Sequence, residues 1–138
     1  QLGINRVQEF LNKIEYGNQT TSSNLDLYWS DFSLKISPLE QVTLLKKFNT
    51  NEFHLNFQNV FSVKNAIKIA STPNGNFYGK TGTGRVNGQD INGWFIGYVE
   101  TSDNSYYFAT NIQSDSNATG KKAFEITSDI LKKLHIWN

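Results

Sequence analysis

An unbroken apolar and aromatic run at residues 94–99, WFIGYV, constrains the fold more than any other feature of the sequence. It lacks the polar alternation of a strand with one solvated face, so it predicts a strand that is covered on both faces. Asn87-Gly88 lies shortly before it and is a strong hairpin signal, because a tight hairpin turn needs left-handed backbone angles. The sequence therefore predicts strands over residues 76–84 and 92–100, joined by a turn at 86–88.

Helices are predicted on either side of these strands. Residues 4–15 and 57–67 carry apolar side chains at helical spacing. A further helix begins after Ser37, where Pro38 occupies the first helical position and Glu40 completes a capping box. A third strand is expected over residues 105–112, and a last helix over 119–134, with Thr119 as its N-cap.

The inward-facing residues of the helices follow from the same spacing. We expect these to be Ile4, Val7, Leu11 and Ile14; Leu39, Val42, Leu45 and Phe48; Val60, Val63 and Ile67; and Ala123, Ile126, Ile130, Leu131 and Leu134. Trp94 and Tyr98 are expected in the core. The element order predicts an α+β fold, with three sequential antiparallel strands flanked by N-terminal helices and covered on one face by a C-terminal helix.

Composition excludes several classes of function. The 138 residues suit one domain, and a net charge of +1 indicates neither nucleic acid nor a membrane surface as partner. The absence of Cys excludes disulfides and thiolate metal sites, and His54 and His135 lack ligand spacing and are expected at the surface. No apolar run reaches the about 18 residues of a membrane span. We expect no metal and no cofactor, and the composition favours an exported bacterial protein.

Gly79-Lys80-Thr81 resembles the end of a phosphate-binding loop, but that interpretation fails. Only three residues separate Gly75 from Gly79 where the motif needs four, and a strand follows where a helix is required. On an edge strand, Lys80 and Gly82 would share one face, and the missing side chain at Gly82 would let a ligand backbone approach. This arrangement suits an acyl compound with a carboxylate. The alternative is an exposed Lys80 beside glycines that only bend the strand.

The motifs together resemble a known family. KTGTG at residues 80–84, followed by NGWFIGYVE at 92–100, resembles the last motif region of the serine-dependent penicillin-recognising proteins. The aromatic run narrows the resemblance to class D β-lactamases and related β-lactam sensor domains, and YGNQ at 16–19 and Trp29 fit the same family. The resemblance implies a DD-peptidase/β-lactamase-like fold, of which residues 1–138 are the C-terminal part of a transpeptidase-like domain.

The chain departs from the family pattern in two ways. The nucleophile motif Ser-x-x-Lys is absent, as is the Ser-x-Val or Ser-x-Asn motif that follows it, so we expect an incomplete domain that does not turn over a β-lactam alone. The missing N-terminal part would supply the nucleophilic Ser and a carbamylated Lys. The arginine that holds the substrate carboxylate in many class D enzymes falls at Ala123. Lys121, Lys122 or the threonines of the KTGTG motif would then make that contact.

The resemblance also implies roles for individual residues in acyl transfer to serine. Lys80 would supply positive potential, Thr81 and the Thr83 hydroxyl would bind the substrate carboxylate, and the Thr83 N–H would form half of an oxyanion hole. Trp29 would donate its indole N–H to the carbamate, unless it serves only loop packing.

Gly82, Tyr16 and Asn18 would complete the substrate-binding residues. For the segment from Tyr16 to Asn18 one alternative is a simple helix stop, and another is that Asn18 holds loop backbone.

Two functions follow from the resemblance. The first is a class D β-lactam hydrolase, and the alternative is the extracellular domain of a membrane-anchored sensor that is acylated without turnover. In either case the ligand is a β-lactam antibiotic, and the protein is exported, either secreted or on the outer face of a bacterial membrane.

Overall fold

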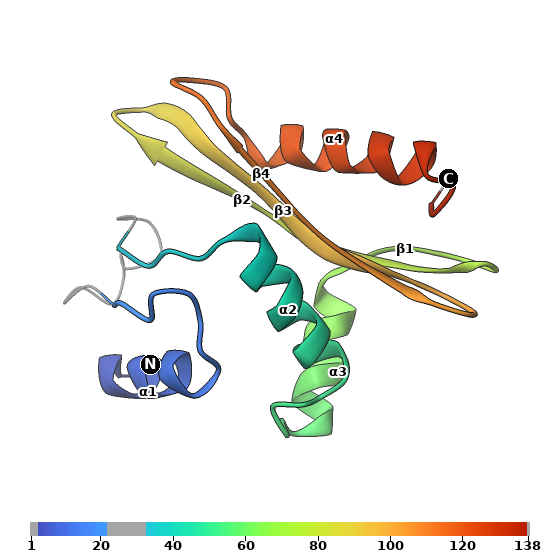
Figure 1. Cartoon of the computed structure of the whole chain (residues 1–138), viewed down its shortest axis with the longest axis horizontal. Helices are drawn as coiled ribbons and strands as arrows, with labels where there is room; N and C mark the ends of the chain where they lie inside the picture. The colour runs from blue at the N-terminus through green and yellow to red at the C-terminus, as the bar shows by residue number, and fades with distance from the viewer. Residues whose placement is uncertain (1–2, 22–32, 138) are drawn as a thin grey trace.

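The computed structural model describes residues 3–21 and 33–137, and it is an α+β fold as predicted. Its elements are α1 (Ile4–Lys13), α2 (Pro38–Asn49), α3 (Phe57–Ala66), β1 (Lys68–Thr72), β2 (Gly75–Val86), β3 (Gln89–Thr101), β4 (Ser105–Gln113) and α4 (Gly120–Lys133). The four strands form an antiparallel sheet of order β1-β2-β3-β4. In Figure 1, α4 lies along one side of this sheet and α2 on the other, with α1 set apart from the strands.

The hairpin signal and the cap signals are confirmed. Val86 pairs with Gln89, and the two residues between them, Asn87 and Gly88, have φ of 49° and 79°. Ser37 and Glu40 form the predicted capping box of α2, and Thr119 caps α4 by accepting a hydrogen bond from a backbone N–H. These signals work because they act within a few residues of the chain.

The sheet has four strands where the sequence predicts three. The additional strand, β1, has only five residues and pairs through Thr72 with Gly75 of β2. It contains a bulge between Lys68 and Ala70, and all but one of its residues are exposed. Because β1 is short and mostly solvated, it lacks the apolar alternation by which a strand is found in a sequence.

The main core lies between the sheet and α4. Its buried members are Phe77, Phe95, Val99, Ala123 and Leu131, with Phe108, Phe124 and Trp137 packed against them. Most of the aromatic rings meet edge to face or tilted, as where the centroids of Phe95 and Phe124 lie 5.0 Å apart, whereas Phe77 and Phe124 stack. Tyr98 is fully buried on the opposite face of the sheet, as expected, whereas Trp94 is only half-buried.

The predicted inward face of α4 is wrong in part. Ala123 and Leu131 are buried, but Ile126 and Ile130 are 39% and 47% exposed and Leu134 is 61% exposed. Thr127 is buried in their place because its hydroxyl bonds the Thr110 hydroxyl at 2.7 Å and the Ala123 carbonyl at 2.8 Å. A polar side chain with two hydrogen-bond partners can thus occupy the core, although hydrophobic spacing selects Ile126 and Ile130 for the inward face.

The same error affects α2 and α3. Leu39 is 77% exposed, while Gln41 is buried with its Nε2 donating to the Tyr16 hydroxyl at 2.7 Å. In α3, Val60 is buried as predicted, but Val63 is 45% exposed. Within the described ranges, no helix combines the length and the apolar character needed to cross a bilayer.

Candidate functional site

Strand β2 changes from an inner strand to an edge strand at Gly79. Its first residues pair with both β1 and β3, and the Gly79 N–H bonds the carbonyl of Ile67 at 2.8 Å. From Lys80 onward, β3 is the only described strand that pairs with β2. The edge-strand prediction for the KTGTG segment is therefore confirmed.

The direction of the Gly79 N–H fixes which amides face the open edge. Backbone N–H groups along a strand alternate between its two neighbours, so every second residue after Gly79 points the same way. These residues are Thr81 and Thr83. Among the described residues no backbone partner is found for either N–H. The open edge thus presents two amide donors in one row, the arrangement by which a strand edge binds an extended ligand.

Lys80 brings a positive charge to this edge. Its side chain is exposed, and its Nζ donates a hydrogen bond of 2.6 Å to the Thr81 carbonyl. Tyr78, two residues earlier, points to the same face of the sheet and stacks on Tyr98 with ring centroids 4.7 Å apart. Burial raises the pKa of both tyrosines, and Glu100 raises them further. Both tyrosines therefore act as neutral groups on this face of the sheet, and Lys80 brings its charge to the start of the open edge.

Thr81 and Thr83 point to the other face, toward α4. The Thr83 Oγ1 accepts a hydrogen bond of 2.9 Å from the N–H of Gly120, the first residue of α4. At Gly82, an added Cβ would meet only the Trp94 Cβ, at an ordinary 3.8 Å. Internal packing therefore does not require a glycine at position 82, which leaves the close approach of a ligand as a reason for one.

The first turn of α4 lies beside these threonines and carries two lysines. Ala123 is fully buried in the core, whereas Lys121 and Lys122 are exposed. Lys121 directly follows Gly120, whose backbone approaches Gly82 of β2, so Lys121 is at the end of α4 nearest the open edge. Its Nζ is 3.9 Å from a Glu125 carboxylate oxygen. Lys122 is turned about 100° further round the helix, away from the sheet.

Asn18 holds loop backbone, as one alternative interpretation of its segment predicts. Its Oδ1 accepts from the Lys35 N–H at 2.9 Å, and its Nδ2 donates to the Ser33 carbonyl at 2.8 Å. Gly17 has φ +51°, and a Cβ there would lie 1.9 Å from the Lys35 carbonyl oxygen. Tyr16 accepts from Gln41. A part for Tyr16 and Asn18 in substrate binding stays a prediction, and Trp29 lies outside the described residues.

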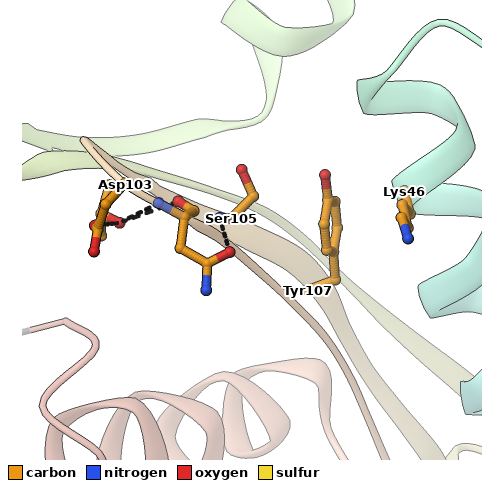
Figure 2. A pocket seen from close by; sticks show the side chains of 6 residues that line it. Lys46, Asp103, Ser105 and Tyr107 are labelled. Carbon is orange, nitrogen blue, oxygen red and sulfur yellow. Dashed lines mark hydrogen bonds between the residues drawn. The ribbon is translucent and has the colours of Figure 1, made fainter.

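A separate hollow of about 600 Å³ lies at the other end of the sheet. Its lining includes Lys46 of α2 and Tyr107 of β4, together with the turn between β3 and β4 (Figure 2). That turn contains Ser102-Asp103-Asn104, which matches the letters Ser-x-Asn. It is not the expected motif, because it follows the KTGTG segment along the chain, whereas the expected motif follows Ser-x-x-Lys. Its Asp103 carboxylate accepts from Thr101 within the turn. None of the predicted site residues that the structure describes lines this hollow, so it is separate from the open edge of β2.

His54 and His135 are exposed, as predicted. Among the described residues, no group of His, Cys, Asp and Glu side chains is arranged to hold a metal ion. Gly120 of α4 and Gly93 of β3 also contact the site, and the sequence analysis did not identify them. The one sequence signal is for Gly120, which directly follows the N-cap Thr119.

Known proteins resemble this chain over almost its whole length. The model of the penicillin binding protein transpeptidase domain matches residues 1–132. The methicillin resistance mecR1 protein of Staphylococcus aureus is 45% identical over 94% of the chain, which corresponds to 22% of that relative. The chain thus spans about a fifth of the length of this curated relative.

Solved structures agree with the sequence match. The C-terminal domain of the Bacillus licheniformis BlaR penicillin-receptor superposes with a TM-score of 0.94 at 45% identity, over 100% of this chain and 56% of that one. A class D β-lactamase from Bacillus subtilis has a TM-score of 0.90 at 36% identity, over 99% of this chain and 55% of that one. The predicted resemblance to class D β-lactamases and penicillin receptors is confirmed, and the chain belongs to the penicillin binding protein transpeptidase domain family.

Proposed function

We propose that this chain supplies the Lys-Thr-Gly half of an active site that binds β-lactams by forming an acyl-serine. The observation that carries the proposal is the open edge of β2, where the amides of Thr81 and Thr83 lie beside the Lys80 ammonium. A β-lactam presents a carbonyl that becomes an oxyanion and a carboxylate that stays charged. An edge that is rich in hydrogen-bond donors and carries a cation complements both groups.

Each residue then has a defined part. The Thr83 N–H donates to the carbonyl oxygen as negative charge develops on it, and the loss of one such donor typically costs about 10²- to 10³-fold in rate. Thr81 and the Thr83 hydroxyl bind the carboxylate, and Lys80 provides the positive potential beside both groups. Lys121 reinforces the carboxylate contact from the first turn of α4, with Lys122 in a lesser part.

The remaining groups come from another part of the same domain. A serine there attacks the lactam carbonyl, and a carbamylated lysine removes the serine proton. The C–N bond of the ring then breaks, and its nitrogen takes up a proton. Trp29 donates its indole N–H to the carbamate, and Gly82, Tyr16 and Asn18 complete the substrate contacts. The 138-residue chain alone lacks the nucleophile, so it is inactive by itself. The complete protein acts outside the bacterial cytoplasm.

Two functions share this acylation and differ in the fate of the acyl group. A hydrolase releases the acyl group with water, as the relation to class D β-lactamases favours. A sensor keeps the acyl group, which is favoured by the higher identity to the BlaR penicillin-receptor, 45% against 36%. The apolar Ala123 at the position of the family's carboxylate-binding arginine is compatible with either function.

A single experiment separates these outcomes. The chain is joined to its natural N-terminal part and mixed with a chromogenic cephalosporin. Sustained colour release means hydrolysis, and a burst of one equivalent, with the adduct seen by intact-protein mass spectrometry, means sensing. The absence of both in the complete domain overturns the proposed function. The 138-residue chain alone, assayed in parallel, is expected to give neither signal.

A further inference from the structure

Helix α4 begins in direct backbone contact with the open half of β2. A Cβ added at Gly120, the first residue of α4, would lie 2.6 Å from the Gly82 carbonyl oxygen, 2.9 Å from the Gly82 nitrogen and 2.9 Å from the Thr81 Cβ. Two of these three neighbours are backbone atoms, which cannot turn aside as the end of a side chain can. Only glycine therefore lets α4 lie this close to the strand.

The same segment is held by a cross-strand pair. Thr83 of β2 is paired with Gly93 of β3, and both side-chain positions point toward α4. The Thr83 Oγ1 accepts from the Gly120 N–H at 2.9 Å. A Cβ at Gly93 would lie 2.4 Å from the Thr119 carbonyl oxygen. The start of α4 is thus fixed against both strands at the level of Thr83.

The hydrogen bond from Gly120 decides what the Thr83 hydroxyl can do. A threonine hydroxyl has one proton to donate and two lone pairs that accept. Because the Gly120 N–H occupies a lone pair, the hydroxyl proton remains available for a group outside the chain. Thr119 Oγ1 accepts from the Lys122 N–H in the same turn, so this first-turn amide is also used within the protein.

We propose that Gly120 is a positioning residue of the active site. It holds the Thr83 hydroxyl as a hydrogen-bond donor toward the ligand's carboxylate, through the bond from its own N–H to the Thr83 Oγ1. This inference rests on the proposed function. It adds that recognition of the carboxylate depends on the first residue of α4, which itself does not touch the ligand.

The test compares two probes on the complete domain. Benzylpenicillin carries the free carboxylate, and its methyl ester does not. Gly120→Ala is expected to lower the second-order acylation rate constant for benzylpenicillin at least about tenfold, or about 1.4 kcal/mol, and to change the rate with the ester by less than about threefold. The preference for the carboxylate is the readout, because a purely structural defect would slow both probes alike.

Gly97→Ala is the matched control. This β3 glycine is packed equally tightly, since a Cβ there would lie 2.1 Å from the Tyr78 carbonyl oxygen, but its nearest neighbours are residues 78, 79 and 108. Per folded molecule, the control variant is expected to keep the preference of the unmodified domain. Equal loss with both probes in Gly120→Ala, or no loss with either, overturns the positioning role.

A second pair of variants tests the same hydrogen bond from the strand. Thr83→Val removes the hydroxyl and is expected to lose the preference for the carboxylate, and Thr83→Ser is expected to restore part of it. This pair tests the proposal even if Gly120→Ala does not fold. A Thr83→Val domain that still reacts faster with benzylpenicillin than with its ester, by the same factor as the unmodified domain, would contradict the proposal. If the unmodified domain is not acylated by benzylpenicillin, the proposed function itself fails, which is a distinct result.

Discussion

The two halves of strand β2 differ in strand pairing and in solvent exposure. In residues 75–79 the strand pairs on both sides, and Phe77 and Tyr78 are only 3% and 5% exposed. In residues 80–86 the side toward β1 is open, and most side chains are exposed. The change falls where β1 begins, since its first residue, Lys68, lies opposite Tyr78. One strand thus anchors the core with one half and presents hydrogen-bond donors with the other.

Packing requires a glycine in the closed half of β2 but not in the open half. A Cβ at Gly79 would lie 2.6 Å from ring atoms of Phe95, so the closed half requires glycine for packing. A Cβ at Gly82 would make only an ordinary contact. The difference teaches that stability and ligand binding depend on different positions of this strand, because packing excludes a side chain at position 79 and does not exclude one at position 82.

The largest effect is expected from Phe77→Ala in the closed half. Phe77 contacts the rings of Phe95, Phe108, Phe124 and Trp137. Its truncation should lower the free energy of unfolding by about 3–5 kcal/mol, measured by urea denaturation of the complete domain. Thr81→Ala in the open half should change it by less than about 1 kcal/mol. Similar losses from both variants would remove the distinction between the halves.

Amide hydrogen exchange should alternate along the open half. Lys80 and Gly82 direct their N–H groups to β3, whereas those of Thr81 and Thr83 face the open edge. We expect the second pair to exchange at least about a hundredfold faster than the first. In the closed half, Phe77, Tyr78 and Gly79 should all be protected. Uniform protection from residue 77 to residue 83, measured by NMR, would mean that the edge is covered.

Lys80→Ala should slow acylation by a β-lactam at least about tenfold, or about 1.4 kcal/mol, with little change in thermal stability. The reason is the loss of the charge beside the Thr81 carbonyl. Arg85→Ala is the control, because Arg85 is another cation of the open half and pairs with Asp90 at 2.7 Å. An unchanged acylation rate in the Lys80 variant would remove Lys80 from the mechanism.

The smallest effect on stability is expected from Tyr98→Phe. Tyr98 lies on β3 opposite Tyr78, in the closed half of β2. The Tyr98 hydroxyl is buried, and no described residue bonds it, so its removal should change stability at pH 7 by less than about 1 kcal/mol. Tyr107→Phe is the control, because the Tyr107 hydroxyl accepts from Asn49 at 2.9 Å. Removing that hydroxyl should lower the free energy of unfolding by about 1 kcal/mol.

Tyr98→Phe should also change how stability depends on pH above pH 10. Burial raises the pKa of Tyr98 above that of an unfolded tyrosine, about 10. The neutral hydroxyl therefore favours the folded state fully below pH 10, and this contribution falls as the pH rises above 10. Tyr98→Phe should lose less stability than the unmodified domain between pH 10 and pH 11. Parallel curves would show that Tyr98 ionises freely in the fold.

Much of the site was predictable because its signals are local or carried by motifs. The KTGTG motif and the Asn87-Gly88 turn predicted an edge strand and a hairpin, and both are present. The roles of Tyr16 and Asn18 were less predictable, since a Tyr-Gly-Asn segment serves equally to end a helix and to hold a loop. The structure describes the second use for Asn18.

The sequence by itself determined every element except β1, together with the cap at Ser37 and the turn at Asn87-Gly88, since these depend on backbone preferences over a few residues. Its motifs also indicated the family. The open edge after Gly79 was decided by the tertiary structure, because it depends on where β1 pairs with β2. Only the tertiary structure decided that Thr127 is buried and Ile126 is not, because that choice depends on the hydroxyl of Thr110 in another element. It also decided that Gly120 lies on the backbone of Gly82. Contacts between residues distant in sequence leave no periodic signal, because they arise only when the packed elements meet.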